Sequence, residues 1–225
     1  MRRNIRATVR ADLLRYEREA WARGARRVCG IDEVGRGPLA GPVVAAAVVL
    51  PEGFEHSRLT DSKKLTPRQR EKIHEELVAL QTLQWSVAFV DAREIDRVNI
   101  LRATWKAMAA ARAGLRDPPD WTLVDGLRVP PLGECQTAIV GGDALSFSIA
   151  AASVIAKVTR DRYMTELDKQ HPRYGFTRHK GYGTTAHLQA LLQFGPCPEH
   201  RRSFAPVHRA ASRRTPGIVR SKPTL

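Results

Sequence analysis

Four acidic residues stand where three short apolar segments of this 225-residue sequence end. Asp32 and Glu33 end the first segment, Asp125 the second and Asp143 the third. Ligands of α/β proteins usually bind at strand ends, so these side chains are candidates for one site. Neighbours on a regular strand point to opposite faces, so Asp32 and Glu33 share a site only if the strand breaks at Glu33. The turn sequence Gly35-Arg36-Gly37 that follows is consistent with such a break.

Four converging carboxylates repel one another unless a cation neutralises them. A ligand set made of carboxylate oxygens favours Mg²⁺ or Mn²⁺ over zinc. Two such ions at one site are the arrangement for in-line phosphodiester cleavage. The spacing alone leaves another interpretation open, in which the aspartates only cap helices or turns.

The elements that must position these carboxylates alternate between helix and strand. Helical spacing of apolar residues, the Thr66-Pro67 start with Gln69, and the Asp91 and Thr185 caps mark the helices. Valine-rich runs bounded by Pro or Gly mark the strands. We predict helices over 11–23, 66–80, 91–114, 146–170 and 185–194, a loop over 171–183, and strands over 28–32, 43–50, 85–90, 121–124 and 137–140. This alternation predicts a mixed α/β domain.

The positive charge lies at the two ends of the chain. The formal net charge of the chain is +14. Residues 1–28 contain nine Arg and three acidic residues, and residues 201–225 contain six Arg, one Lys and no acidic residue. Basic ends of this kind commonly bind a polyanion, because each neutralised phosphate releases a counterion. A tail that only keeps the protein in solution remains the alternative.

Seven sequence blocks together resemble the ribonuclease HII family, the type 2 ribonucleases H. Their order is that of the family, and they cover about residues 11–208. The blocks are CGIDEVGRGPLAGPVV at 29–44, TDSKKL at 60–65, VDG at 124–126, GGD at 141–143, SIAAASVIAKVTRD at 148–161, HKGYGT at 179–184 and HRRSF at 200–204.

The resemblance implies an RNase H-like fold, an α/β fold with a central mixed β-sheet flanked by α-helices. It implies an endoribonuclease that hydrolyses the RNA strand of RNA–DNA hybrids. It also implies cleavage on the 5′ side of single ribonucleotides embedded in duplex DNA, leaving 5′-phosphate and 3′-hydroxyl ends. The implied cofactor is Mn²⁺ or Mg²⁺, with two divalent ions during catalysis.

The same resemblance assigns roles to individual residues. The four catalytic, metal-binding carboxylates of the family fall on Asp32, Glu33, Asp125 and Asp143. Its Gly-Arg-Gly segment, which reads the 2′-hydroxyl, falls on Gly35, Arg36 and Gly37. Tyr182 matches the tyrosine that packs on the sugar at the RNA–DNA junction, and Lys63 and Lys64 fit phosphate contacts. Arg201 and Arg202 could contact phosphates in the same way, although exposed basic residues are more often simply solvated.

A few positions depart from the family or suggest something else. Gly141 stands where relatives often have a basic residue, which would remove a phosphate contact and leave the metal ligands intact. Gln189, Leu192 and Phe194 have the spacing of a sliding-clamp-binding peptide, but we disfavour that contact because they fall in a predicted helix. We assign no catalytic role to His179 or His187.

We divide the chain into a basic arm (1–10), a catalytic domain (11–208) and a basic tail (209–225) that we expect to be disordered. The apolar stretch from Pro38 to Pro51 is too short to span a bilayer, and no secretory signal is visible. We therefore expect a monomeric cytoplasmic protein without membrane contacts. The alternatives are a non-catalytic binder of hybrid or duplex nucleic acid and a type 3 ribonuclease H; the four acids beside Gly35-Arg36-Gly37 argue against the first, and the context of Tyr182 against the second.

Overall fold

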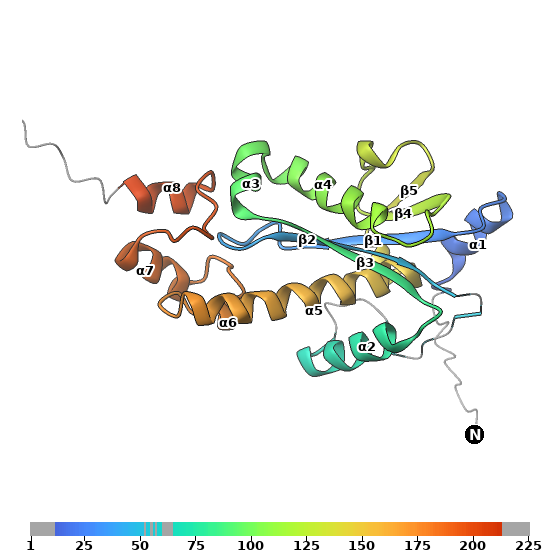
Figure 1. Ribbon diagram of the computed structural model, residues 1–225, viewed down its shortest axis with the longest axis horizontal. Coiled ribbons are helices and arrows are strands. Elements are labelled where there is room, and N and C mark those ends of the chain that lie inside the picture. Colours follow the sequence, from blue (N-terminus) through green and yellow to red (C-terminus); the bar gives the residue numbers. More distant parts are fainter. Residues whose placement is uncertain (1–11, 52, 55, 57, 60–64, 213–225) are drawn as a thin grey trace, which may run out of the picture. The chain divides into compact units, whose positions relative to one another are not determined.

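The apolar segments that lead to the carboxylates form one sheet. Its strand order is β3-β2-β1-β4-β5, and the β1–β4 and β4–β5 pairs are parallel. Every residue of β2 is buried, as its Val and Ala composition predicts for a strand covered on both faces. The strands are β1 Val28–Val34, β2 Val43–Val49, β3 Gln84–Val90, β4 Trp121–Asp125 and β5 Gln136–Ile139. The computed structural model therefore confirms the predicted α/β fold with a central mixed sheet (Figure 1).

The structure describes residues 12–212 except 52, 55, 57 and 60–64. The α-helices of this part are α1 Arg15–Ala22, α2 Pro67–Ala79, α3 Ala92–Val98, α4 Ile100–Ala113, α5 Phe147–Gln170, α6 Phe176–His179, α7 Thr185–Phe194 and α8 Ala205–Ser212. Two short 3₁₀ helices, η2 Pro130–Leu132 and η3 Gly142–Ala144, lie between them. None of the helices in these ranges is long and apolar enough to cross a membrane.

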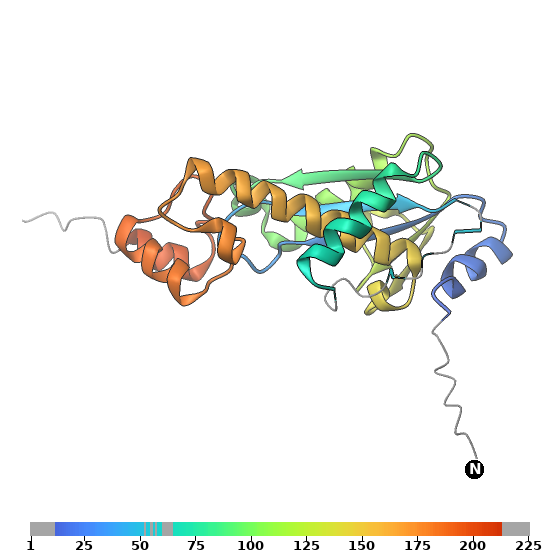
Figure 2. The same ribbon diagram turned by 90° about the horizontal axis from the view of Figure 1, so that it is seen from below.

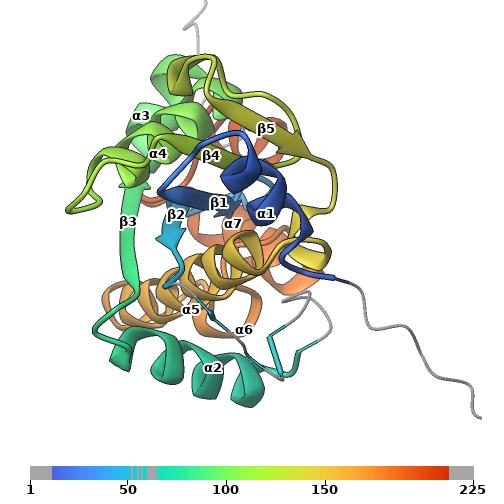
Figure 3. The same cartoon turned by 90° about the vertical axis from the view of Figure 1, so that its right-hand side faces the viewer.

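The chain divides into two compact units. The first contains the described residues of Met1–Val34, Ala45–Ala88 and Trp105–Val158. In this unit α2 lies alongside the first half of α5, on the face of the sheet opposite α4 (Figures 2 and 3). The close approach of β1 to α5 requires Gly30, since a Cβ there would lie 2.2 Å from the backbone of Ser148.

The second unit contains the described residues of Gly35–Val44, Phe89–Thr104 and Thr159–Leu225. Its helices α7 and α8 pack side by side, with Leu191 and Val207 buried between them (Figure 1). A second cluster joins Met164 of α5 to the rings of Tyr174 and Phe176. These two clusters hold the loop 35–44 and the loop that carries Tyr182 within one packed unit.

The structure corrects several element boundaries. The helix expected over 91–114 is wrong as a single helix, because Asn99 adopts a left-handed φ of 71° and ends α3. Its side chain then accepts a hydrogen bond from the Arg102 N–H and starts α4. Thr184 caps α7 in place of Thr185, and the expected loop 171–183 contains α6. Helix α8 runs to Ser212, so residues 209–212 are helical; the rest of the expected tail and the arm 1–10 lie outside the described residues.

Candidate active site

Strand pairing places two of the carboxylates side by side. β1 and β4 run parallel with Ile31 opposite Val124, so Asp32 and Asp125 are the next residues along two neighbouring strands. Parallel strands end at the same edge of a sheet, which is why carboxylates far apart in the sequence meet there. β1 continues to Val34, so Asp32 and Glu33 both belong to the strand, and the predicted break at Glu33 is wrong. The two carboxylates are nevertheless close enough for the charge of Glu33 to raise the pKa of Asp32.

Asp32 is a strongly perturbed group at this edge. It is 6% exposed, and burial raises its pKa well above the usual range, with the nearby charges of Glu33 and Asp125 adding to the effect. Hydrogen bonds from Ser153 of α5 and from the Glu33 N–H, the latter 2.7 Å long, oppose this change. The three carboxylates are thus close enough to repel one another.

Asp143 reaches the same region through a turn. It lies in η3, is 2% exposed, and follows Gly142, whose N–H donates to Oδ1 of Asp125 over 2.7 Å. Gly141 begins the turn with a left-handed φ of 71° and open space around its Cβ position. A basic side chain there would be strained by the backbone conformation and not by crowding.

Glu17 supports this turn and was missed by the sequence analysis. Its carboxylate is 1% exposed, and Oε1 accepts hydrogen bonds from the Ser146 hydroxyl (2.6 Å), the Ser148 hydroxyl (2.7 Å) and the Ser148 N–H (3.0 Å). These bonds fix the start of α5, three to five residues after Asp143. Nothing in the sequence distinguishes Glu17 from an exposed acid such as Glu19 on the same helix.

The donor set at this edge fits a hard divalent cation. It offers only carboxylate oxygens, and the mutual repulsion around Asp32 would be relieved by positive charge. Within the described ranges, however, no group of three or more His, Cys, Asp or Glu side chains is already arranged to hold a metal ion.

The second unit brings the loop 35–37 to Tyr182. Arg36 and Gly37 are exposed, and a Cβ on Gly37 would lie 3.6 Å from Cε1 of Tyr182. Gly35 is buried with a φ of 93°, and a Cβ there would lie 2.3 Å from Nε of Arg160. Any other residue at position 35 would be strained and would collide with that arginine.

A buried arginine, Arg201, holds this loop through its backbone carbonyls. Arg201 donates to the carbonyl oxygens of Gly35 (2.6 Å), Arg36 (2.9 Å) and Gly41 (2.8 and 3.0 Å). Arg201 is neither solvated nor placed to contact a phosphate, because its side chain is completely buried and donates to backbone carbonyls. Arg202 is exposed, and its N–H donates to Asp96.

A chain of neutral histidines fixes the backbone at Tyr182. The Tyr182 carbonyl can only accept, so His187 carries its proton on Nδ1 (2.9 Å) and presents Nε2 as an acceptor to Nε2 of His200 (3.0 Å). Nδ1 of His200 then accepts from the N–H and the thiol of Cys197. Burial lowers the pKa of His187 to about 4 and that of His200 to about 3. Both rings are neutral at pH 7, and Tyr182 itself is 43% exposed.

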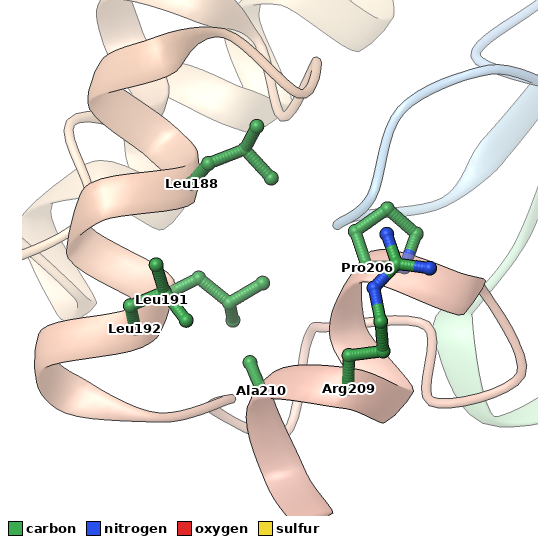
Figure 4. Close-up of a pocket in the computed structure, with 6 residues that line it drawn as sticks. All are labelled: Leu188, Leu191, Leu192, Pro206, Arg209 and Ala210. Atoms are coloured by element: carbon green, nitrogen blue, oxygen red, sulfur yellow. The ribbon is translucent and has the colours of Figure 1, made fainter. Parts of the chain in front are cut away.

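The remaining candidates are two lysines and the clamp-like residues. Lys63 and Lys64 lie outside the described residues. The clamp-like residues belong to helix α7, where Phe194 packs edge-on against Tyr174. Figure 4 shows Leu188 and Leu191 of the same helix pointing into a groove beside α8. These three residues therefore do not form an exposed, extended peptide.

Several known proteins are similar to this chain in sequence and in fold. A family model described as Ribonuclease HII matches residues 29–207. The ribonuclease HII of Geobacillus kaustophilus (strain HTA426) is 56% identical over 197 residues, which make up 87% of this chain and 75% of that protein. The crystal structure of the ribonuclease H2 from Pyrococcus horikoshii OT3 is similar with a TM-score of 0.71 and 29% identity, over 84% of this chain and 98% of that one. The structure of the PCNA:RNase HII complex from Archaeoglobus fulgidus is similar with a TM-score of 0.64 and 25% identity, over 80% of this chain and 95% of that one.

Proposed function

Because the chain belongs to the ribonuclease HII family and is therefore a hydrolytic endoribonuclease that acts on RNA strands, we propose that its substrates include duplex DNA with a single embedded ribonucleotide. The cut falls on the 5′ side of the ribonucleotide and leaves 5′-phosphate and 3′-hydroxyl ends. The observation that carries this proposal is the burial of Asp32 beside the charges of Glu33 and Asp125, all three of which lie within the matched residues.

We propose that Asp32, Glu33, Asp125 and Asp143 hold the divalent ions, Mn²⁺ or Mg²⁺, on which enzymes of this family depend. Bound ions supply an activated water and stabilise the departing 3′-oxygen. The chain's own contribution is to hold its ligands in place: Ser153 orients Asp32, and the Gly142 N–H orients Asp125. No basic side chain is needed at the nucleophile in such a site.

We propose that Gly35, Arg36, Gly37 and Tyr182 contact the ribonucleotide. The exposure of Arg36 and Gly37 and the proximity of Gly37 to the Tyr182 ring support a shared role. Main-chain donors at a glycine-rich turn can approach a sugar closely, and the 2′-hydroxyl is the group that distinguishes RNA from DNA. Lys63 and Lys64 remain proposed phosphate contacts on sequence grounds alone. We propose no clamp contact through α7.

The test uses an end-labelled DNA duplex with one ribonucleotide and its all-DNA counterpart, with Mn²⁺, with Mg²⁺, or with a chelator. We expect a chelator-sensitive nick 5′ of the ribonucleotide and none in the all-DNA duplex.

Asp125→Asn should lower turnover by at least about a thousandfold while binding stays within about threefold, because the amide cannot supply the ligand charge. Normal turnover in this variant would remove Asp125 from the site. Binding without any nick by the wild-type protein would favour a non-catalytic binder instead.

A further inference from the structure

Two guanidinium groups are completely buried in the second unit. Within the described residues, every hydrogen bond of the Arg160 and Arg201 guanidinium groups goes to a backbone carbonyl oxygen and none to a carboxylate. Burial lowers the pKa of Arg201 to about 9 and that of Arg160 to about 10, so both remain charged at pH 7. A buried charge without an acidic partner is unfavourable, so the backbone segments that these two side chains bind must account for their burial.

The two arginines bind different peptide groups. Arg160 donates to the carbonyls of Ala40 (3.2 Å), Pro42 (2.9 Å) and Lys180 (2.9 Å). Arg201 donates to the carbonyl of Gly41 and also to those of Gly35 and Arg36. Within the described structure, these last two are the only carbonyls of the loop 35–37 that either arginine binds.

The geometry of the peptide bond gives these last two contacts a consequence. None of the described peptide bonds is cis, and in a trans peptide the C=O and N–H point in opposite directions. The Gly35 carbonyl shares its peptide group with the Arg36 N–H, and the Arg36 carbonyl shares its own with the Gly37 N–H. Arg201 lies completely buried on the carbonyl side, so both N–H groups point away from it. A charge on the carbonyl side also polarises a peptide and makes its N–H a stronger donor.

We propose that Arg201 is a positioning residue that aims and strengthens the N–H groups of Arg36 and Gly37 as donors to the 2′-hydroxyl oxygen of the ribonucleotide. The inference rests on the proposed function, in which the loop 35–37 contacts the ribose. It adds a buried residue that never touches substrate and yet determines how strongly ribose is preferred to deoxyribose. A phosphate oxygen could accept from the same donors, but phosphates are present in both kinds of strand, so only the 2′-hydroxyl makes the contact selective.

Arg160 provides a matched control for this proposal. It has the same burial and the same kind of carbonyl partners, so Arg160→Lys and Arg201→Lys each keep a positive charge and remove the guanidinium fork. Only Arg201→Lys releases the two peptides that carry the proposed donors. Loss of fold stability is therefore common to the two variants, and loss of ribose selectivity is specific to one.

The measurement is the affinity of the full chain, without divalent ions, for an RNA–DNA hybrid and for a DNA duplex of the same sequence. We expect Arg201→Lys to weaken hybrid binding about tenfold and duplex binding by less than about twofold, which corresponds to about 1.0–1.4 kcal/mol of lost discrimination. Arg160→Lys should change both affinities by the same factor. Equal losses on both duplexes in Arg201→Lys, or full selectivity in a folded Arg201→Lys, would overturn the proposal.

A second measurement needs no variant. In ¹⁵N-labelled wild-type protein, the amide signals of Arg36 and Gly37 should move downfield when the hybrid is added and stay in place with the all-DNA duplex. Unmoved signals would overturn the proposal even if Arg201→Lys fails to fold. A wild-type protein that neither prefers the hybrid nor cuts it would instead refute the proposed function, so the two failures are distinguishable.

Discussion

For a single residue, Asp32, folding stability and cation binding favour opposite charge states of the side chain. It is buried beside Glu33 and Asp125, so its negative charge opposes folding, yet that charge is what a divalent cation needs. A site of this kind is expected to be less stable when empty than a neutral version of itself. Stability and metal binding therefore pull this residue in opposite directions.

We expect Asp32→Asn to raise the melting temperature in a chelator by about 2–4 °C, because it removes a buried charge and keeps an acceptor for Ser153. The same variant should lose most of the additional stabilisation that Mn²⁺ gives the wild-type protein. Differential scanning calorimetry with and without Mn²⁺ measures both effects. Glu166→Gln, at an exposed pair with Lys169, should change neither, and an Asp32→Asn protein that Mn²⁺ stabilises as strongly as the wild type would contradict the assignment of Asp32.

The histidine pair predicts a pH dependence of stability. His187 and His200 have folded pKa values of about 4 and about 3, below the value of 6.5 that is usual for histidine. Between these values the unfolded chain binds more protons than the folded one, so the free energy of unfolding falls as the pH drops below 6.5. The slope reaches at most about 1.4 kcal/mol per pH unit for each histidine.

Urea unfolding at several pH values between about 4 and 7 tests this dependence. Asp32 contributes with the opposite sign because its pKa is raised, so the informative quantity is the difference between the wild type and His187→Gln. We expect the variant to have a flatter profile, whereas His208→Gln on the exposed side of α8 should leave the profile unchanged. Parallel profiles for the wild type and His187→Gln would mean that the pair titrates normally.

At the scale of elements, helix α5 depends on α1 for its start. Glu17 of α1 accepts three hydrogen bonds at the first residues of α5, and Asp143 precedes that point by only a few residues. The negative charge also lies at the N-terminal end of a helix, where it is favourable. A short amphipathic helix far from Asp143 in the sequence thus supports the turn that carries it.

We expect Glu17→Ala to lower the free energy of unfolding by about 2–3 kcal/mol, because three donors lose a charged acceptor inside the protein. Urea unfolding measures this loss. Glu19→Ala removes an exposed acid of the same helix, paired with Arg15, and should change stability by less than about 0.5 kcal/mol. Similar losses in the two variants would show that the bonds of Glu17 contribute little beyond those of a surface acid.

Local sequence patterns predicted most helices and strands correctly but did not predict where neighbouring elements begin and end. The capping box of Thr66 and Gln69 has both its hydrogen bonds, and the valine-rich strands lie where their composition predicts. The break at Asn99 was missed because the apolar spacing continues across it while the backbone turns. Arg201 and Glu17 were missed as supports of the site because their burial depends on partners distant in the sequence, which no local pattern of charged residues reveals.

At the scale of the whole molecule, the basic ends remain the feature that the folded part does not explain. Residues 213–225 contain three Arg, one Lys and no acid. Helix α8 includes the buried Val207 and Ala210, so a cut at residue 209 would remove part of the core, and the charge is cleanly separated only after Ser212. The proper truncation therefore ends at Ser212.

We expect a chain that ends at Ser212 to bind the RNA–DNA hybrid more weakly, with a slope of log affinity against log salt that is smaller by about 0.9 for each lost phosphate contact. Fluorescence anisotropy between about 50 and 200 mM salt gives the slope. A full-length variant with Arg213, Arg214, Arg220 and Lys222 replaced by serine separates charge from length and should reproduce the smaller slope. If both proteins keep the wild-type slope, the tail does not touch phosphates, and its charge acts only on the solution behaviour of the protein.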